Sequence, residues 1–178
     1  PKVINGSLRF NDDDSAYLSW TPASAGNRKT WTWSGWVKRS SLGYQFLFDA
    51  FVNDDNRTFC YFFSDDTLRF FSRESNTNNL FLISNAVFRD VGAWYHIVFV
   101  ADFDNGTQTE RAKVYVNGEQ ITSFSTATYP SSASINTMAS YSSANHSIGT
   151  ADDSTGYFNF FDGYLANVHF IDGQALTA

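Results

Sequence analysis

The sequence predicts an all-β protein, an antiparallel sandwich of two sheets or a jelly roll, and three observations support this prediction. Aromatic residues make up 18% of the 178 residues, far more than disordered chains carry. The strong helix formers are scarce, with three glutamates and four lysines, which excludes a helical bundle. Apolar residues recur in short alternating runs separated by turn residues, and this pattern is typical of β-strands.

The alternating runs predict one strand after another along the whole chain. Each run is bounded by Asn, Asp, Ser or Gly, the residues that favour turns. Turn signals at this short spacing are typical of sandwiches and jelly rolls. The predicted strands are residues 6–10, 16–20, 31–38, 45–52, 57–63, 67–72, 79–83, 94–101, 111–116, 119–123, 145–149, 156–160 and 163–171.

Two of these strands show different environments. In residues 94–101 both alternating sets are apolar, which predicts a central strand that is covered on both faces. In residues 111–116 the apolar side chains alternate with Lys113 and Tyr115, which predicts one solvated face. Asn117-Gly118 follows, and this pair favours a tight hairpin because both residues tolerate positive φ.

The chain organisation predicts a single domain over residues 1–178. The longest stretch without a strand pattern is 123–145, which is rich in Ser, Thr and Ala. Long loops of this kind are usually functional or mobile. The chain starts at Pro1 and stops within residues 173–178 in the middle of a pattern, so we expect it to be part of a longer protein.

The net charge, the hydropathy and the single cysteine exclude several classes of partner and of covalent cross-link. The net charge of −6 and the lack of basic clusters exclude nucleic acid as a partner. No apolar stretch reaches the roughly 18 residues that a membrane-spanning helix needs, so we expect no membrane insertion. The single cysteine, Cys60, has no internal disulfide partner and lies among aromatic residues, which predicts a buried small hydrophobe.

Five segments together resemble one known family. Residues 93–100 (AWYHIVFV) and 113–119 (KVYVNGE) are similar to the central hairpin of laminin-G-like and pentraxin-like domains. Residues 7–12 (SLRFND) resemble their opening strand, 32–38 (TWSGWVK) an inner strand, and 161–170 (FDGYLANVHF) the closing strand. The resemblance implies the jelly roll of the concanavalin A-like lectin/glucanase superfamily. In this fold the first and last strands often lie side by side.

The end of the chain carries a second, narrower resemblance. Residues 170–176 (FIDGQAL) resemble lectin-like domains of bacteriophage virion proteins. This resemblance implies a tail-fibre, receptor-binding or capsid-decoration module, located on the virion surface or otherwise extracellular. Fibre proteins often assemble as trimers, so the resemblance leaves a homo-oligomer open.

The acidic residues and histidines of the chain do not predict an enzyme. Glucanases of this superfamily use paired carboxylates on one strand, and retaining glycosidases place them about 5–5.5 Å apart. The only glutamates are Glu74, Glu110 and Glu119, and none has an acidic partner two or four residues away on a strand. The histidines also lack the sequence context of a hydrolytic triad.

Acidic clusters are compatible with a calcium site, and the alternative is that Asp and Asn occupy turns for conformational reasons. Calcium takes oxygen ligands from Asp, Asn and loop carbonyls, and relatives in the family often bind it at strand ends. Because the first and last strands of this fold are expected to be neighbours, we predict Asp12 and Asp14 with Asp162 as the ligands of Ca²⁺.

Tyrosines beside polar residues are the predicted glycan-binding groups. A sugar ring stacks on an aromatic side chain, while Asn and Asp hydrogen-bond to its hydroxyls. The tryptophans Trp20, Trp31, Trp33, Trp36 and Trp94 lie within strand patterns and are expected in the core. The predicted ligand-binding residues are Tyr44, Asn53, Asp54, Asp55, Asn56, Tyr129, Tyr141 and Tyr157.

The sequence therefore favours a non-catalytic module that recognises a carbohydrate, such as a cell-surface glycan or polysaccharide. The alternative is a purely structural virion module that contacts other virion proteins or further copies of itself. Clustered tyrosines with polar partners would favour the glycan, whereas a flat apolar patch of several hundred Å² would favour protein contact.

Overall fold

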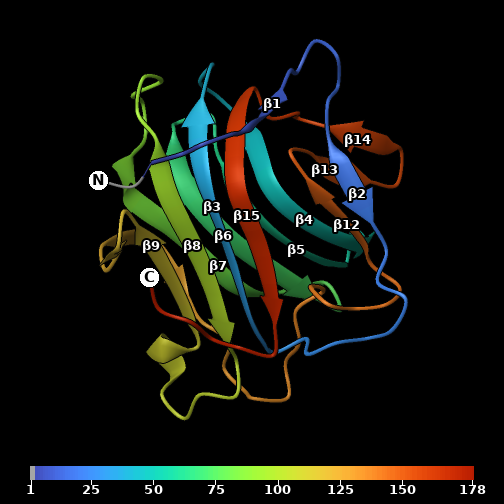
Figure 1. Ribbon diagram of the computed structural model, residues 1–178. Coiled ribbons are helices and arrows are strands. Elements are labelled where there is room, and N and C mark those ends of the chain that lie inside the picture. Colours follow the sequence, from blue (N-terminus) through green and yellow to red (C-terminus); the bar gives the residue numbers. More distant parts are fainter. Residues whose placement is uncertain (1–2) are drawn as a thin grey trace.

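The computed structural model describes residues 3–178 and shows two antiparallel sheets packed face to face (Figure 1). The one helical element among these residues is a 3₁₀ turn at Gln108–Glu110. No helix in the described part of the chain is long and apolar enough to cross a membrane. The predicted all-β sandwich is confirmed.

The six-stranded sheet and the seven-stranded sheet have different strand orders. The six-stranded sheet runs β1 (Leu8–Phe10), β15 (Gly163–Asp172), β3 (Thr30–Arg39), β8 (Tyr95–Asp102), β9 (Ala112–Val116) and β10 (Glu119–Gln120). The seven-stranded sheet runs β11 (Phe124–Thr128), β7 (Thr77–Val87), β6 (Thr67–Glu74), β5 (Asn56–Phe62), β4 (Gln45–Asn53), β12 (Asn145–Ile148) and β2 (Leu18–Trp20). A separate hairpin joins β13 (Ala151–Asp153) to β14 (Gly156–Phe158).

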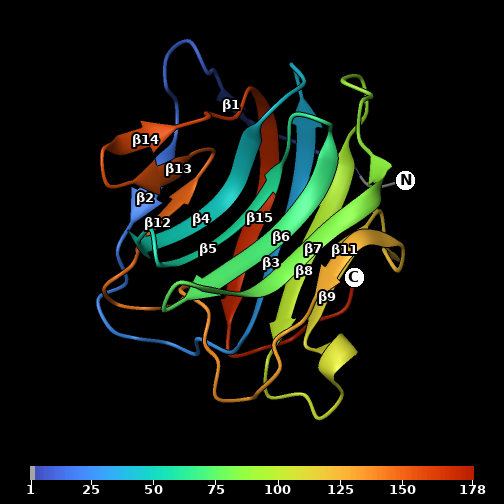
Figure 2. The ribbon, with the colours of Figure 1, turned by 180° about the vertical axis from the view of Figure 1, so that it is seen from behind.

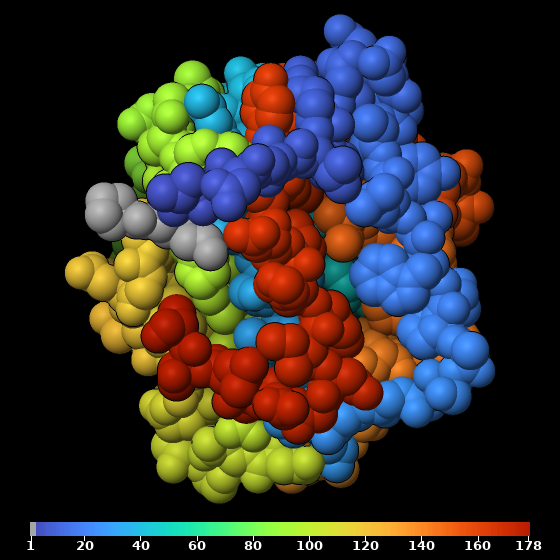
Figure 3. Space-filling view, viewed as in Figure 1, coloured from blue at the N-terminus to red at the C-terminus, as the bar shows by residue number. Residues whose placement is uncertain are grey.

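Two expectations about strand neighbours are confirmed. The first and last strands pair antiparallel, with Leu8 opposite Leu165. Strand β8 lies between β3 and β9, as expected for a run that is apolar on both faces. Its outer side chains Val98 and Val100 are buried, and Figures 1 and 3 show both terminal segments crossing the outer face of this sheet.

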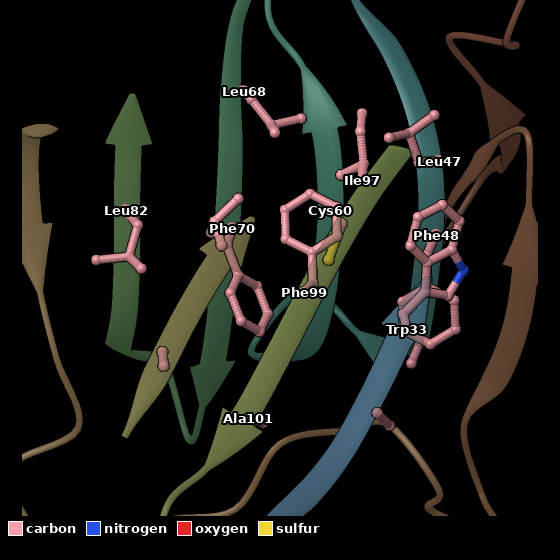
Figure 4. Packing of buried hydrophobic residues seen from close by; sticks show 14 of the residues in the cluster. Trp33, Leu47, Phe48, Cys60, Leu68, Phe70, Leu82, Ile97, Phe99 and Ala101 are labelled. Carbon is pink, nitrogen blue, oxygen red and sulfur yellow. The ribbon is translucent and has the colours of Figure 1, made fainter. Parts of the chain in front are cut away.

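Aromatic side chains fill the space between the sheets. Trp33 and Phe99 from the six-stranded sheet meet Phe48 and Phe70 from the seven-stranded sheet in one buried cluster (Figure 4). The rings of Phe70 and Phe99 lie edge to face, with centroids 5.4 Å apart. Cys60 is buried in the same cluster, which confirms its prediction as a small hydrophobe, and burial raises the pKa of its thiol.

The core assignment of the tryptophans is right for two of five. Trp31 and Trp33 are completely buried. Trp36 and Trp94 are only half-buried, and Trp20 is 36% exposed. The expectation fails for Trp20 because its strand, β2, is the last of the seven-stranded sheet and no strand of the other sheet in the described chain lies opposite it.

Residues 123–145 are not structureless throughout, which corrects the prediction. Strand β11 pairs with β7 at the edge of the seven-stranded sheet, with Thr128 opposite Phe81. The following segment is fastened to the body of the protein, because Glu74 accepts hydrogen bonds from the main-chain and side-chain nitrogens of Asn136. The exposed edge strand FSTAT lacks the apolar alternation that reveals a buried strand.

Candidate ligand-binding face

The predicted tyrosines do not form one site. Tyr44 precedes β4 and packs on the outer side of the seven-stranded sheet. Tyr129 and Tyr141 pack against the core from the loop after β11, and the guanidinium of Arg28 stacks on Tyr141 at 4.3 Å. Tyr157 lies in β14, where its hydroxyl accepts a hydrogen bond of 2.8 Å from Asn145.

The polar residues Asn53, Asp54, Asp55 and Asn56 form the turn between β4 and β5. Asn53 Oδ1 accepts hydrogen bonds from the Asp55 main chain at 3.1 Å and from Asn56 Nδ2 at 2.9 Å. Asn56 Oδ1 in turn accepts from the main-chain nitrogen of Ser75. Asn53 and Asn56 therefore hold the turns in shape, while the Asp54 side chain stays largely exposed.

The three predicted calcium ligands are not assembled into a cluster. Asp162 forms an ion pair of 2.7 Å with Arg9, and Asp14 accepts a hydrogen bond from Asn11. Asp12 accepts from the main chain of Asp13. Within residues 3–178, no group of three or more His, Cys, Asp or Glu residues is placed to hold a metal ion.

The calcium site stays a prediction with a direct test. If Ca²⁺ binds at Asp12, Asp14 and Asp162, added calcium raises the melting temperature and a chelator lowers it, because binding to the folded state alone stabilises that state. Differential scanning calorimetry with calcium and with EDTA measures both shifts. An unchanged melting temperature in both conditions contradicts the site.

The outer face of the seven-stranded sheet gathers aromatic and basic side chains. Alternation places Arg57, Phe59 and Tyr61 of β5 on this face, because Thr58 and Cys60 point into the core. In the same way β6 presents Arg69, Phe71 and Arg73, and β7 presents Phe81. We call these seven residues the arginine–aromatic face. Figure 2 shows this side of the sheet, with the β13–β14 hairpin at one margin.

The aromatic rings form a band across three strands. Phe59, Phe71 and Phe81 are direct cross-strand neighbours. Phe59 and Phe71 stack with centroids 4.6 Å apart, and Phe71 meets Phe81 edge to face at 5.5 Å. Tyr61 extends the band towards Phe46, on which it stacks at 5.1 Å. The β13–β14 hairpin covers one end of this band, where Phe158 meets Phe46 with centroids 5.8 Å apart. Elsewhere side chains cover it, and Phe59, Tyr61 and Phe71 are buried.

Arginines flank the band on both sides. Arg57 and Arg73 lie directly opposite each other on β5 and β6, an arrangement of like charges that destabilises a sheet. Asp54 offsets part of this repulsion, because its carboxylate is 3.8 Å from Arg57 and its carbonyl accepts a hydrogen bond from Arg73. On the other side, Arg69 stacks on Phe63 at 3.6 Å and pairs with Asp65.

The β13–β14 hairpin is fastened beside Arg57. Arg57 donates a hydrogen bond of 2.8 Å to the carbonyl of Asp152, and the main-chain nitrogen of Asp152 donates one of 2.8 Å to Asp49. Burial raises the pKa of the Asp49 carboxyl to about 7, although Arg57 acts against this rise. Burial also raises the pKa of Tyr61 to about 12, so its phenol stays protonated and can donate a hydrogen bond.

Sequence reasoning missed the arginines and phenylalanines of this face. The signal was present in the alternation itself, because Arg57, Phe59 and Tyr61 occupy every second position of one run. The same holds for Arg69, Phe71 and Arg73 in the next run.

Two antiparallel sheets packed face to face, with only the β13–β14 hairpin lying on the outer face of the seven-stranded sheet among residues 3–178, define a lectin-like β-sandwich. The family model described as the concanavalin A-like lectin/glucanases superfamily matches residues 12–178. The chain belongs to this family. No curated protein sequence matches the chain.

Three solved structures with the same fold come from different kinds of protein: a pentraxin, a laminin and a sialidase. A heptameric SAP-like pentraxin from Limulus polyphemus is 19% identical, with 99% of this chain and 75% of that chain covered and a TM-score of 0.59. Mouse laminin alpha1 domains LG4-5 are 11% identical, with 98% and 44% covered and a TM-score of 0.66. The Ruminococcus gnavus IT-sialidase CBM40 bound to alpha2,3 sialyllactose is 14% identical, with 90% and 92% covered and a TM-score of 0.63. At these identities the likeness concerns the fold.

Proposed function

We propose that this protein is a non-catalytic carbohydrate-recognition module that binds an acidic glycan on the arginine–aromatic face. One observation carries the proposal: Arg57 and Arg73 lie directly opposite each other beside the stacked rings of Phe59 and Phe71. Like charges at this spacing cost stability, and an anionic ligand between them offsets that cost.

The chemistry of the face suits a sugar that carries a carboxylate or sulfate. Guanidinium groups bind such groups through paired, charge-assisted hydrogen bonds. Arg73 uses two of its nitrogens within the protein, donating from Nε to Asn78 and from Nη1 to Asp54, which leaves Nη2 for a ligand. The buried rings of Phe59 and Phe71 lie beneath Arg57 and Arg73, at 4.7 Å and 5.6 Å, and so hold the guanidinium groups in place on the face.

The comparisons support an acidic ligand by analogy. One fold neighbour is the Ruminococcus gnavus IT-sialidase CBM40 bound to alpha2,3 sialyllactose, and another is the same module bound to alpha2,6 sialyllactose. Sialyllactose carries a carboxylate. Its binding in a sandwich of this fold agrees with the guanidinium groups found on this face.

The glutamates support the absence of catalysis. Glu74 accepts hydrogen bonds from Asn136 and lies 3.5 Å from Arg28, so it serves to fasten a loop. Glu110 pairs with Lys113 at 2.7 Å, beside the 3₁₀ turn. These carboxylates sit in separate parts of the fold, each with a basic partner of its own, which is unlike the close pair that a glycosidase needs.

Replacement of Arg73 tests the proposal. We expect Arg73→Gln to weaken binding of the acidic glycan about 10- to 100-fold, because one charge-assisted hydrogen bond contributes roughly 1.5–3 kcal/mol. A glycan array of acidic and neutral saccharides, run with and without calcium, identifies the ligand, and titration calorimetry measures the loss.

The matched control is Lys38→Gln, which removes the same charge from β3 on the other sheet. It should leave the affinity unchanged. Equal affinity of wild type and Arg73→Gln, or binding of neutral glycans alone, overturns an acidic ligand on this face. Binding to no glycan in either condition favours the structural role.

We further propose, from the resemblance of residues 170–176, that the module acts on a bacteriophage virion surface as part of a tail fibre or receptor-binding protein. In that setting, contacts with other virion proteins form a second function. A cluster of exposed apolar side chains that includes Leu8, Tyr17, Leu18 and Trp20 favours such a contact.

A further inference from the structure

The six-stranded sheet ends short of the seven-stranded sheet on one side of the sandwich. Beyond β15 it has only β1, which pairs with Gly163, Tyr164 and Leu165. The rest of β15, residues 166–172, has no strand on that edge among residues 3–178. The seven-stranded sheet, in contrast, continues past β4 with β12 and β2.

This mismatch leaves core-facing side chains uncovered. Leu18 and Trp20 alternate with Ser19, and they lie opposite Ile148 and His146 of β12. These positions face the interior of the sandwich, where His146 is buried. Leu18 is nevertheless 47% exposed and Trp20 36% exposed. Within the described chain they lack the strand of the six-stranded sheet that would cover them.

A groove occupies the place of the missing strand. It consists of two hollows of about 450 Å³ and 280 Å³. The first is lined by Leu18 and Val168, and the second, two residues further along each strand, by Trp20 and Phe170. Figure 3 shows the surface hollowed between the red atoms of β15 and the blue atoms of the β2 segment. Side chains on one face of a β-strand recur every two residues, so the two hollows are spaced as the side chains of an added strand would be.

The unpaired edge of β15 offers main-chain hydrogen bonds to the groove. The main-chain nitrogen of Gly173 donates to the carbonyl of Thr30 at 2.9 Å, in register with the β15–β3 ladder. Because hydrogen-bonded positions alternate in an antiparallel ladder, the N–H and C=O groups of Phe170 and Asp172 point away from β3. They point towards the groove.

One fixed negative charge lies at the end of the groove. Asp172 Oδ1 accepts hydrogen bonds from the main chain of Asn27 at 2.8 Å and from Ser140 Oγ at 2.7 Å. A side chain at Gly26 would collide with this carboxylate, so glycine leaves it room. Oδ2 accepts no hydrogen bond from the described residues. Among residues 3–178, Asp172 is the only Asp, Glu, Lys or Arg that lines either hollow.

We propose that an extended peptide segment of a partner protein adds to β15 in this groove as an extra strand of the six-stranded sheet. Its main chain pairs with Phe170 and Asp172, and alternate apolar side chains cover Leu18 and Trp20. A lysine or arginine of the segment pairs with Asp172. The carboxylate of Asp172 favours a basic residue in the segment, and the two-residue spacing of the hollows favours apolar side chains at alternate positions.

Three probe peptides test the proposal by fluorescence anisotropy. The first is a labelled nine-residue peptide of alternating valine and threonine that ends in lysine. The second ends in glutamate instead. The third is N-methylated at every residue, which removes all of its main-chain donors. We expect the first to bind, the second to bind about fivefold more weakly, and the third not to bind at all.

Matched variants locate the binding. Leu18→Ser should weaken binding of the lysine peptide about tenfold, because it removes a covered apolar contact. Leu42→Ser should not, although Leu42 has the same exposure of 47% and lies outside the groove. Asp172→Asn should abolish the preference for lysine over glutamate. Amide hydrogen exchange of Phe170 and Asp172 should slow when the lysine peptide binds.

Several results would overturn the addition of a partner strand to β15. Binding of the N-methylated peptide as tightly as its parent shows that side chains alone are recognised, which overturns strand addition. No binding of the lysine peptide at about 1 mM, a concentration that detects even weak complexes, or unchanged exchange at Phe170 and Asp172, also overturns it. Self-association of the protein in sedimentation, blocked by Leu18→Ser, would identify a second copy as the occupant and overturn a separate partner. These results do not depend on whether a glycan binds.

Discussion

Replacing Arg39 with methionine should lower the free energy of unfolding by about 3–5 kcal/mol, because breaking a buried ion pair leaves the partner charge without compensation. Arg39 is completely buried in β3. It donates hydrogen bonds to Asp66 at 3.0 Å, to the carbonyl of Phe88 at 2.8 Å and to Gln45 at 3.1 Å. Burial lowers the pKa of Arg39, while Asp66 acts to raise it.

The expected loss comes mainly from Asp66. Burial acts to raise its pKa, but hydrogen bonds from Arg89, Gly43 and Arg39 hold the pKa below the ordinary value. Without Arg39 the carboxylate keeps only its more exposed partners. Urea unfolding followed by tryptophan fluorescence measures the change.

The matched control for this prediction is Arg89→Met, which removes the second arginine from the same carboxylate. Arg89 pairs with Asp66 at 3.1 Å, but its side chain is 61% exposed. We expect Arg89→Met to cost less than about 1 kcal/mol. If Arg39→Met costs no more than Arg89→Met, the ion pair does not contribute to stability in the way described.

The second large effect is a pair of opposing pH dependences, from His146 and Asp49. Burial lowers the pKa of His146 from 6.5 to about 4, and burial raises that of Asp49 from 3.8 to about 7. His146 is held neutral between two partners: its Nε2 accepts a hydrogen bond from the Ser140 main chain, and its Nδ1 lies 2.9 Å from the carbonyl of Ala144.

The signs of the two effects follow from proton binding. For His146 the unfolded chain binds the proton first as the pH falls, so its contribution to stability is present above pH 6.5 and is lost towards pH 4. For Asp49 the folded protein keeps the proton longer, so its contribution is present below pH 3.8 and is lost as the pH rises through about 7. Each effect is on the order of 3 kcal/mol. In the wild type they largely cancel.

Single variants separate the two contributions. In Asp49→Asn the free energy of unfolding should rise by on the order of 3 kcal/mol between pH 4 and pH 6.5, because His146 alone remains. In His146→Gln it should fall by a similar amount between pH 4 and pH 7. Urea unfolding at half-unit pH steps gives both profiles. Parallel profiles for the two variants contradict the assigned pKa shifts.

Most of the fold could be predicted from the sequence because its strands are either buried or strongly alternating. Residues 31–38, 45–52 and 94–101 correspond closely to β3, β4 and β8. The strands that were missed are β11 and β13, which are short and lack large apolar side chains on alternate positions. Pairing at a sheet edge or in a small hairpin forms them, and that pairing leaves little trace in local composition.

Less of the candidate site could be predicted. The expectation of tyrosines beside polar residues was chemically reasonable, but Tyr129 and Tyr141 pack against the core and Asn53 and Asn56 hold a turn. Only the sheet register brings Arg57 opposite Arg73. Register is set by long-range pairing, and one residue of slip between β5 and β6 would put the two arginines on opposite faces of the sheet.

The central claim is that the arginine–aromatic face binds an acidic glycan, and NMR mapping tests it most directly. The protein, labelled with ¹⁵N, is titrated with sialyllactose and with the strongest acidic ligand from the array. We predict shifts at the Nε–H signals of Arg57, Arg69 and Arg73 and at the amides of Phe71 and Phe81. Shifts confined to the six-stranded sheet or to the β15 groove, or no shift at saturating concentrations of either ligand, would contradict the claim.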